Sequence, residues 1–280
     1  MERHQEEPQF REGEEKPKDW LPDGTEQEQY LKEDKEWRGL EKRLGEPRIL
    51  KNVYYPEVMD WIQREFKGNP DDFSYFEAGC GHGNDLRAMR KELDGRGRFL
   101  GVDMSKAEIM RGLEFYRPQD DPEAARSLFA QGDLRDLRHI FVWDKGQGDF
   151  SQQTEIKDDE CDVVYMEAVL HGLGYGKKTF QEKKESARQM LTELHRICRP
   201  GGRFFGRANA FGPTITKEQQ LELLRRTNNW RFFPEAEEFE EMLRQTGFTN
   251  IQKTLRQREK ADKDPNKKDI LRFSFLADKA

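Results

Sequence analysis

The stretch YFEAGCGHGNDLRAM, residues 75–89, places three glycines at alternate positions, behind an acid and ahead of a helical pattern. The segment FSYFEA (73–78) has the composition of a buried strand, and NDLRAMRKEL (84–93) has helical periodicity. Glycines between a strand and a helix let a ligand approach the backbone, and the helix N-terminus adds the positive end of a dipole. The stretch therefore predicts a ligand-binding loop at the end of the first strand of an α/β fold.

Strands and helices alternate on the C-terminal side of this stretch. Because helices of this length between strands imply crossover connections, the sheet is expected to be mainly parallel. We expect strands at 73–78, 98–103, 127–133, 161–169, 202–210, 249–257 and 270–280, and helices at 58–66, 84–93, 105–116, 182–198 and 234–246. The predicted fold is a Rossmann-like, doubly wound sheet of seven strands, mainly parallel with an antiparallel C-terminal strand, and with helices on both faces.

The composition predicts a heavily solvated surface, with a mean hydropathy of -1.07 and 37% charged residues. No apolar run approaches the roughly 20 residues that a membrane-spanning helix needs. The first ten residues lack the apolar core of a secretory signal, and the three cysteines form no CxxC pair, so we expect a cytoplasmic protein without a metal site. The net charge of -6 argues against a polyanion partner for the whole chain, without excluding a local basic groove.

The first 46 residues differ from the rest, because 24 of them are charged. Such a segment buries little apolar surface, and we expect a partly disordered extension over 1–46. Residues 25–44 have sparse apolar anchors for one helix. A solvated tail and a lid that orders over a ligand both remain open for this extension, and the globular domain is expected at 47–280.

The acids near the glycines indicate which kind of ligand the loop binds. The glycine spacing is GxGxG rather than the GxGxxG of dinucleotide-binding loops, and Glu77 lies two residues before the first glycine. A carboxylate there repels a pyrophosphate and attracts an amino group or a sulfonium. Asp103 ends the second strand, where an acid accepts hydrogen bonds from ribose hydroxyls. Asp133 follows the third strand and suits an exocyclic adenine amine.

Five motifs occur in a characteristic order: YFEAGCGHG (75–83), FLGVD (99–103), QGDL (131–134), DVVYMEAVLHGL (162–173) and ICRPGG (197–202). In this order they resemble the class I S-adenosylmethionine-dependent methyltransferases, especially the branch with many small-molecule enzymes, over roughly residues 50–280. The resemblance implies S-adenosyl-L-methionine as the cofactor, S-adenosyl-L-homocysteine as the product, and methyl transfer by in-line displacement.

The resemblance also assigns roles to individual residues. It implies a cofactor-binding set around the loop and the next strand ends: Glu77, Gly79, Cys80, Gly81, Gly83, Asp103, Met104, Asp133, Leu134, Met166 and Glu167. In this set Glu77 organises the loop or binds the methionine amino group, and Met104 packs on the adenine. For Cys80, small-residue packing is also an open interpretation. Gly172 stands where the family often has a second histidine, which puts a base role for that pair in doubt.

Candidate catalytic and acceptor-binding residues lie at the end of the fourth strand and in the variable segments. Glu167 and His171 are candidate bases, although each has a structural alternative, as a turn cap or a core histidine. Acceptor contacts are expected from Tyr54, Tyr55, His171, Arg207 and Trp230. Tyr54 and Tyr55 close over the cofactor or anchor the first helix. The insertion at about 207–239 combines arginines with aromatic residues and is expected to cover the substrate.

Three classes of function remain open from the sequence. The first is methylation of a small-molecule acceptor on N, O or C. The second is methylation of RNA or protein, because GNDL (83–86) and GVDMS (101–105) also resemble the cap guanine-N7 enzymes. The acidic chain without a long basic run makes a nucleic-acid partner the weaker expectation. The third is a regulatory relative that binds the cofactor without catalysis.

Overall fold

The computed structural model of this protein describes residues 47–67, 69–114, 126, 128–170, 179–211, 216, 218, 234–257 and 270–280. The chain divides into two units, Met1–Gly45 and Glu46–Ala280, and all described residues belong to the second. The predicted helix at 25–44 and most of the predicted insertion at 207–239 lie outside the described residues.

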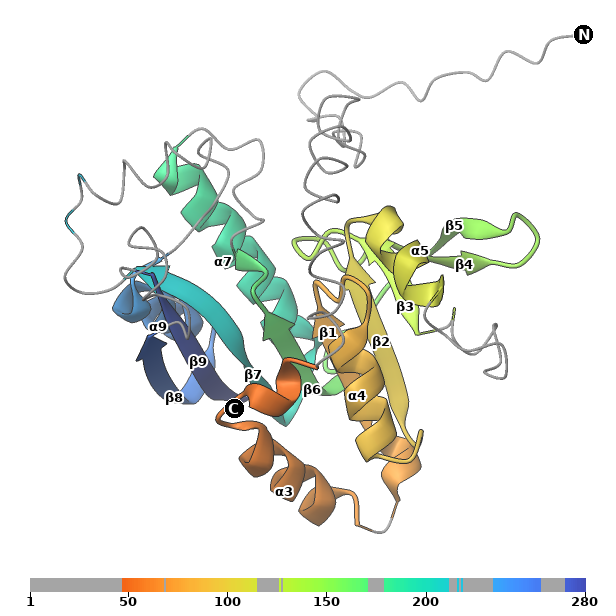
Figure 1. Cartoon of the computed structure of the whole chain (residues 1–280), viewed down its shortest axis with the longest axis horizontal. Helices are drawn as coiled ribbons and strands as arrows, with labels where there is room; N and C mark the ends of the chain where they lie inside the picture. The colour runs from red at the N-terminus through yellow and green to blue at the C-terminus, as the bar shows by residue number, and fades with distance from the viewer. Residues whose placement is uncertain are drawn as a thin grey trace, which may run out of the picture. The chain divides into compact units, whose positions relative to one another are not determined.

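Within the described residues the strands form one sheet in the order β5-β4-β3-β2-β1-β6-β7-β9-β8 (Figure 1). The strands are β1 (Ser74–Ala78), β2 (Arg98–Asp103), β3 (Phe129–Gly132), β4 (Ile140–Asp144), β5 (Asp149–Thr154), β6 (Cys161–Glu167), β7 (Cys198–Phe211), β8 (Phe248–Gln257) and β9 (Ile270–Lys279). The five central strands, in the order β3-β2-β1-β6-β7, pair in parallel. The flanking strands β4 and β5 on one side, and β9 and β8 on the other, pair antiparallel. The predicted fold class is confirmed.

The sheet contains one feature that the sequence pattern did not predict. β4 and β5 form an antiparallel hairpin that extends the edge beyond β3, so the described sheet has nine strands instead of seven. The hairpin turns at residues 145–148, where Gly148 has a φ of +68°. Four consecutive apolar residues at 140–143, before a glycine-containing turn, are the sequence signal for this hairpin.

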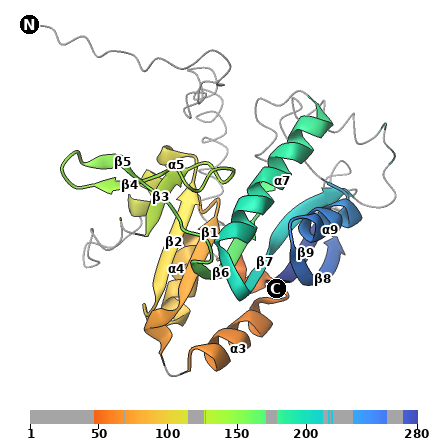
Figure 2. The same cartoon turned by 180° about the vertical axis from the view of Figure 1, so that it is seen from behind.

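Helices cover both faces of the sheet (Figure 2). They are α3 (Tyr55–Glu65), α4 (Asn84–Glu92), α5 (Lys106–Glu114), α7 (Phe180–Ile197) and α9 (Ala236–Gln245), with short 3-10 helices η1 (Ile49–Lys51) and η2 (Pro70–Asp72). One apolar cluster packs residues of η1, α3, α4 and α5 on one face, and a second packs α7 and α9 on the other. This two-sided burial explains why β1 and β6 are almost entirely buried along their length.

The strong start and stop signals of α7 explain why its bounds were predictable. Thr179 caps the helix by accepting a hydrogen bond from the N–H of Glu182, and the Glu182 side chain accepts one from the N–H of Thr179. The helix ends at Ile197, and β7 begins at the next residue with Arg199-Pro200-Gly201, in which Gly201 has a φ of +73°. The helix therefore delivers the chain directly into β7, beside β6.

Candidate functional site

The glycine loop lies between β1 and α4, at the edge of the sheet where the parallel strands end. Gly79, Gly81 and Gly83 have φ angles of +67°, +49° and +68°, a region that side-chain-bearing residues rarely adopt. The N–H groups of Gly79 and Cys80 both donate to the carbonyl of Val102, at distances of 2.8 and 3.1 Å. The loop is thereby bent over the end of β2, and it brings the start of α4 to the same edge.

The three glycines differ in what surrounds them. A Cβ added at Gly79 would lie 2.5 Å from the Val169 side chain, and one added at Gly83 would lie 2.5 Å from the Phe129 ring. At Gly81 no described atom lies within 4 Å of the added Cβ. Gly79 and Gly83 therefore serve close packing of the protein, whereas Gly81 faces space that is open among the described residues.

Glu77 is a buried carboxyl group next to this loop. Its residue is only 3% exposed, and its Oε2 atom has no hydrogen-bond partner among the described residues. The backbone N–H of Leu86, in the first turn of α4, donates to the carboxyl group. Burial raises the pKa of Glu77 well above its usual value, and the nearby Asp85, Asp103 and Glu167 raise it further against the opposing effect of the Leu86 bond. A buried acid with an orphaned oxygen needs a cationic or hydrogen-bond-donating partner.

Asp103 fixes the loop from the end of β2. Its Oδ2 atom accepts a hydrogen bond from the N–H of Gly81, and its Oδ1 atom accepts one from the N–H of Ser105, both at 2.8 Å. Burial raises the pKa of Asp103, while these two N–H groups act in the opposite direction. Each carboxylate oxygen still has accepting capacity, so ribose hydroxyls are compatible with this arrangement.

Glu167 ends β6 and pairs with Arg207 in β7. The two residues are in register, and Arg207 Nε lies 2.7 Å from Glu167 Oε2. The Arg207 side chain is only 6% exposed and the Glu167 side chain 8%. The Tyr165 hydroxyl donates to the same oxygen at 3.2 Å. Beyond the strand, the N–H of Ala168 donates to the Arg207 carbonyl, and Ala168 adopts a φ of +58°. This turn carries Val169 back onto Gly79.

Sequence reasoning missed Asp85, the second residue of α4. Its Oδ1 atom accepts hydrogen bonds from the backbone N–H groups of Arg48 and, at 2.9 Å, Ile49. Arg207 Nη2 donates to the carbonyl of Arg48 at 2.9 Å. The acid in the first helical turn of NDLRAM was the available signal, but its partners are backbone groups more than 30 residues away in sequence.

The charge balance at this edge of the sheet favours a cationic ligand. The carboxyl groups of Glu77, Asp85, Asp103 and Glu167 interact electrostatically, and Arg207 forms an ion pair with Glu167. Burial raises the pKa of Asp85 to about 6, with Glu167 adding to the effect against the bonds from Ile49 and Arg48. The orphaned Glu77 oxygen and the open space at Gly81 therefore fit the amino group and sulfonium of the predicted cofactor.

The residues predicted to bind adenine lie at the ends of β2 and β3. Met104 is 40% exposed, whereas Leu134 is buried. Gln131 Nε2 donates to the Met104 carbonyl at 3.4 Å, which links the two strand ends. Both carboxylate oxygens of Asp133 accept a hydrogen bond from Arg135 Nε, Oδ1 at 3.0 Å and Oδ2 at 2.7 Å. This acid therefore already has a cationic partner.

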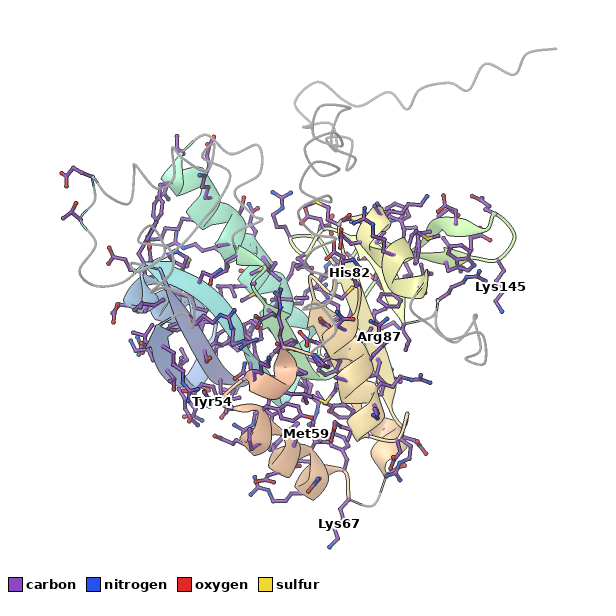
Figure 3. All side chains as sticks on the ribbon, viewed as in Figure 1. Tyr54, Met59, Lys67, His82, Arg87 and Lys145 are labelled. Atoms are coloured by element: carbon purple, nitrogen blue, oxygen red, sulfur yellow. The ribbon has the colours of Figure 1, made fainter. Side chains whose placement is uncertain are left out.

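The two tyrosines predicted to contact the acceptor lie at the start of α3. The Tyr54 hydroxyl lies 3.0 Å from Thr254 Oγ1 in β8, and Figure 3 shows Tyr54 well away from His82 of the glycine loop. The Tyr55 hydroxyl is buried, and burial with the nearby Glu92 raises its pKa to about 12. The Tyr54 contact ties the start of α3 to β8, and a contact of either tyrosine with the acceptor stays a prediction.

Other predicted residues complete the comparison. Cys80 is buried against Gly101, and burial followed by Asp103 and Glu77 raises the pKa of its thiol well above the usual value. Met166 is fully buried, and its carbonyl lies against Gly206 of β7. His171 and Trp230 lie outside the described residues.

Within the described ranges no group of three or more His, Cys, Asp or Glu residues is arranged to hold a metal ion, and no helix is long and apolar enough to cross a membrane.

Three comparisons with known proteins bear on this site. A family model described as a methyltransferase domain matches residues 50–253. Among curated protein sequences, none matches this chain.

Solved structures with the same fold include several methyltransferases. Phosphoethanolamine N-methyltransferase 2 of Haemonchus contortus, solved with phosphomonomethylethanolamine and S-adenosylhomocysteine, has a TM-score of 0.52 at 15% identity. The match covers 82% of this chain and 59% of that one, so the chain spans about three fifths of that enzyme's length. A putative sarcosine dimethylglycine methyltransferase from Galdieria sulphuraria has a TM-score of 0.54 at 10% identity, with coverages of 81% and 86%.

Geranyl diphosphate C-methyltransferase of Streptomyces coelicolor, solved with S-adenosylhomocysteine, has a TM-score of 0.50 at 11% identity, with coverages of 81% and 80%. At these identities the structural likeness establishes the fold, which agrees with the strand order found here. The family model matches most of the chain, which establishes the family. The glycine loop and the acids around it are consistent with this family. The chain belongs to the methyltransferase-domain family.

Proposed function

We propose that this protein is an S-adenosylmethionine-dependent methyltransferase that methylates N, O or C of a small-molecule acceptor. The observation that carries the proposal is the orphaned Oε2 atom of the buried Glu77, beside a loop in which Gly81 faces open space. An amino group next to Glu77 would remove the penalty of this buried, unpaired acceptor. Family membership over residues 50–253 supports the same assignment.

Each part of the cofactor has a proposed partner in this chain. The loop Gly79–Cys80–Gly81–Gly83 surrounds the methionine portion, with Glu77 holding the amino group. Asp103 holds the ribose, and its bond to Gly81 links ribose binding to the conformation of the loop. Met104, Asp133 and Leu134 hold the adenine, and the backbone at Met166 and Glu167 closes the site.

When bound, the cofactor supplies a methyl group on a sulfonium that is already activated for in-line displacement. The protein's part is then to align the acceptor and to exclude water. The Glu167 carboxyl group accepts hydrogen bonds from Arg207 and from the Tyr165 hydroxyl, and these bonds fix its position at the end of β6. Glu167 and His171, the latter outside the described residues, stay the candidate bases where an acceptor needs one.

The small-molecule acceptor is supported by structural neighbours that were solved with small molecules, phosphomonomethylethanolamine and geranyl diphosphate. It is also supported by the net charge of -6, which disfavours a polyanion such as RNA. Arg207, predicted to contact the acceptor, is taken up by Glu167 and the Arg48 carbonyl in this structure. Arg207 therefore contributes to acceptor binding through its hold on Glu167.

Calorimetry with S-adenosylhomocysteine tests the cofactor. We expect binding to the wild type, and weaker binding to Asp103→Ala, because hydrogen bonds to a carboxylate contribute about 1.5–3 kcal/mol each. A folded wild type that does not bind would refute the proposal. The acceptor is tested by incubating cell extract with the protein and methyl-labelled cofactor, followed by mass identification of the product. Label in RNA or in protein instead of a small molecule would replace the proposed acceptor class.

A further inference from the structure

A short backbone segment before α3 is bound by Asp85 and Arg207, and we call residues 48–52 the strap. Ile49 is fully buried and Asn52 is 3% exposed. Ile49 shares an apolar cluster with Tyr75, Tyr165 and Phe205, which are side chains of β1, β6 and β7. The strap therefore lies on the sheet face that also carries α4, next to the strand ends of the site; it is the orange segment before α3 in Figure 1.

The backbone of the strap is bound by two side chains, those of Asp85 and Arg207. Asp85 accepts the N–H groups of Arg48 and Ile49 on a single oxygen, Oδ1. Arg207 donates through Nη2 to the carbonyl of Arg48, and through Nε to Glu167. One peptide segment thus connects the first turn of α4 with Arg207 of β7, and the chain of contacts leads from Asp85 to Glu167.

This fastening lies among the acids of the site. Asp85 interacts electrostatically with Glu77 and Glu167, and its residue is only 5% exposed. Burying a carboxyl group near two like charges is costly, and the cations that interact with Asp85 are Arg48 of the strap and Arg207, which holds the strap. An ordinary terminal anchor needs no such placement, because exposed polar groups or apolar contacts suffice. The position of Asp85 is explained if the strap is part of the ligand site.

We propose that the strap is a wall of the cofactor's amino-acid end, and that Asp85 and Arg207 are positioning residues that hold it. The proposal rests on the proposed function and adds a role for Asp85 and Arg207, which both bind the backbone of Arg48. With the wall in place, water is kept from Glu77 and Glu167, so their attraction for a cationic ligand is less screened. Without it, the same carboxyl groups are hydrated and bind the ligand more weakly.

Substitution of Arg48 isolates the backbone bond. Arg48 has φ of -80° and ψ of -26°, a φ that proline adopts, so Arg48→Pro removes the N–H that Asp85 accepts without forcing a new φ. Arg48→Ala loses the same side chain but keeps the N–H, and it is the matched reference. We expect Arg48→Pro to bind S-adenosylhomocysteine about tenfold more weakly than Arg48→Ala, as for the loss of one charge-assisted bond. If the wild type binds and the two variants have equal affinities, the proposal that the strap is a wall of the site would be overturned.

Substitution of Asp85 tests the fastening without any ligand. Asparagine keeps one carbonyl oxygen and so keeps an acceptor for both N–H groups, whereas alanine keeps none. In hydrogen exchange of the free protein, the strap amides should exchange about tenfold faster in Asp85→Ala than in the wild type, with Asp85→Asn close to the wild type. Adding S-adenosylhomocysteine should slow the exchange of the same amides in the wild type.

The outcomes separate the two proposals. Strap amides that exchange alike in Asp85→Ala and Asp85→Asn, or that do not respond to the ligand, would overturn the positioning role. If the wild type binds no S-adenosylhomocysteine, the proposed function fails and the wall fails with it. If the wild type binds and only the Arg48 and Asp85 comparisons show no difference, the proposed function stands and the wall alone is rejected.

Discussion

The carboxylate of Glu167 and the guanidinium of Arg207 form a buried ion pair across adjacent strands, with 2.7 Å between Oε2 and Nε. The register of β6 and β7 places the two residues opposite each other, at the edge where both strands leave the parallel part of the sheet. Arg207 also holds the backbone of Arg48. This pair therefore links a predicted catalytic residue with the segment that enters the domain.

Breaking the pair is expected to destabilise the fold strongly. Arg207→Met leaves the Glu167 carboxylate buried without its cation, and we expect a loss of about 3 kcal/mol in the free energy of unfolding. Urea denaturation measures it. Arg138→Met, which breaks an exposed pair with Asp158, is the control and should change stability very little. Similar effects of the two substitutions would show that the Glu167–Arg207 pair is not buried in solution.

Because the space at Gly81 is open, a substitution there is expected to weaken ligand binding much more than it lowers stability. Gly81→Ala adds a methyl group where no described atom lies nearby, so we expect a modest loss of about 1–2 kcal/mol from the positive φ and a large loss of S-adenosylhomocysteine affinity. Gly148→Ala, in the β4–β5 turn, has a similar φ and equally open surroundings away from the site. It should lose similar stability and keep the affinity. Calorimetry and denaturation of both variants check this, and equal binding would exclude a ligand at Gly81.

Gly83→Ala should behave differently from Gly81→Ala. Its added Cβ would lie 2.5 Å from the Phe129 ring, so the variant is expected to lose more stability than Gly81→Ala. A Gly83→Ala protein as stable as Gly81→Ala would mean that Phe129 moves freely to make room.

Glu77 predicts an unusual dependence of stability on pH. Burial raises its pKa in the folded state, so its favourable contribution is fully present below the unfolded pKa of about 4.3 and is lost as pH rises through the folded pKa. Glu77→Gln keeps an acceptor for the Leu86 N–H but carries no titrating proton. In the absence of ligand, the variant should gain stability relative to the wild type as pH rises above about 5.

The same substitution is expected to weaken S-adenosylhomocysteine binding, because the amino group loses an anionic partner. Urea denaturation at several pH values, together with calorimetry at neutral pH, measures both effects. Asp85 titrates in an overlapping range, with its pKa raised to about 6, and it is common to both proteins. A variant that is less stable than the wild type at pH 8 would contradict the buried, unpaired state of Glu77.

Adenine recognition by Asp133 is testable because Arg135 already occupies part of its carboxylate. If Asp133 accepts the exocyclic amine, the wild type should bind S-adenosylhomocysteine more tightly than its inosyl analogue, which has a carbonyl in place of the amine. Asp133→Ala should remove most of this preference, a change of about tenfold. Arg135→Ala keeps the acid and should keep the preference. An unchanged preference in Asp133→Ala assigns adenine recognition to other groups.

The parallel core of the fold was predictable, because each of its elements is specified locally. The strand predicted at 161–169 contains the apolar run 163–166, as expected for a strand buried on both faces, and α7 has a capping box and a Pro-Gly stop. The β4–β5 hairpin was missed because its second strand, Asp149–Thr154, is mostly polar and lies at the edge of the sheet. Edge strands bury one side at most, so they lack the apolar pattern that identifies a strand.

The candidate site was predictable where it depends on one strand end at a time. Glu77, Asp103 and Asp133 each follow or end a strand, and parallel strands bring their C-terminal ends to one edge. The pairing of Glu167 with Arg207 was not predicted, although both residues were named. It depends on the register between β6 and β7, which no local pattern specifies.

By itself, the sequence determined the order of elements, the glycine loop and the acids at the strand ends, because short-range periodicity and backbone preferences act within a few residues. The tertiary structure alone decided which of these groups are paired. It showed that Asp85 binds the backbone of the strap, that Arg207 holds Glu167, and that Glu77 keeps an oxygen without a partner among the described residues. Such partners come from distant parts of the chain, and a hydrogen bond to a backbone N–H requires no particular side chain that a sequence pattern would reveal.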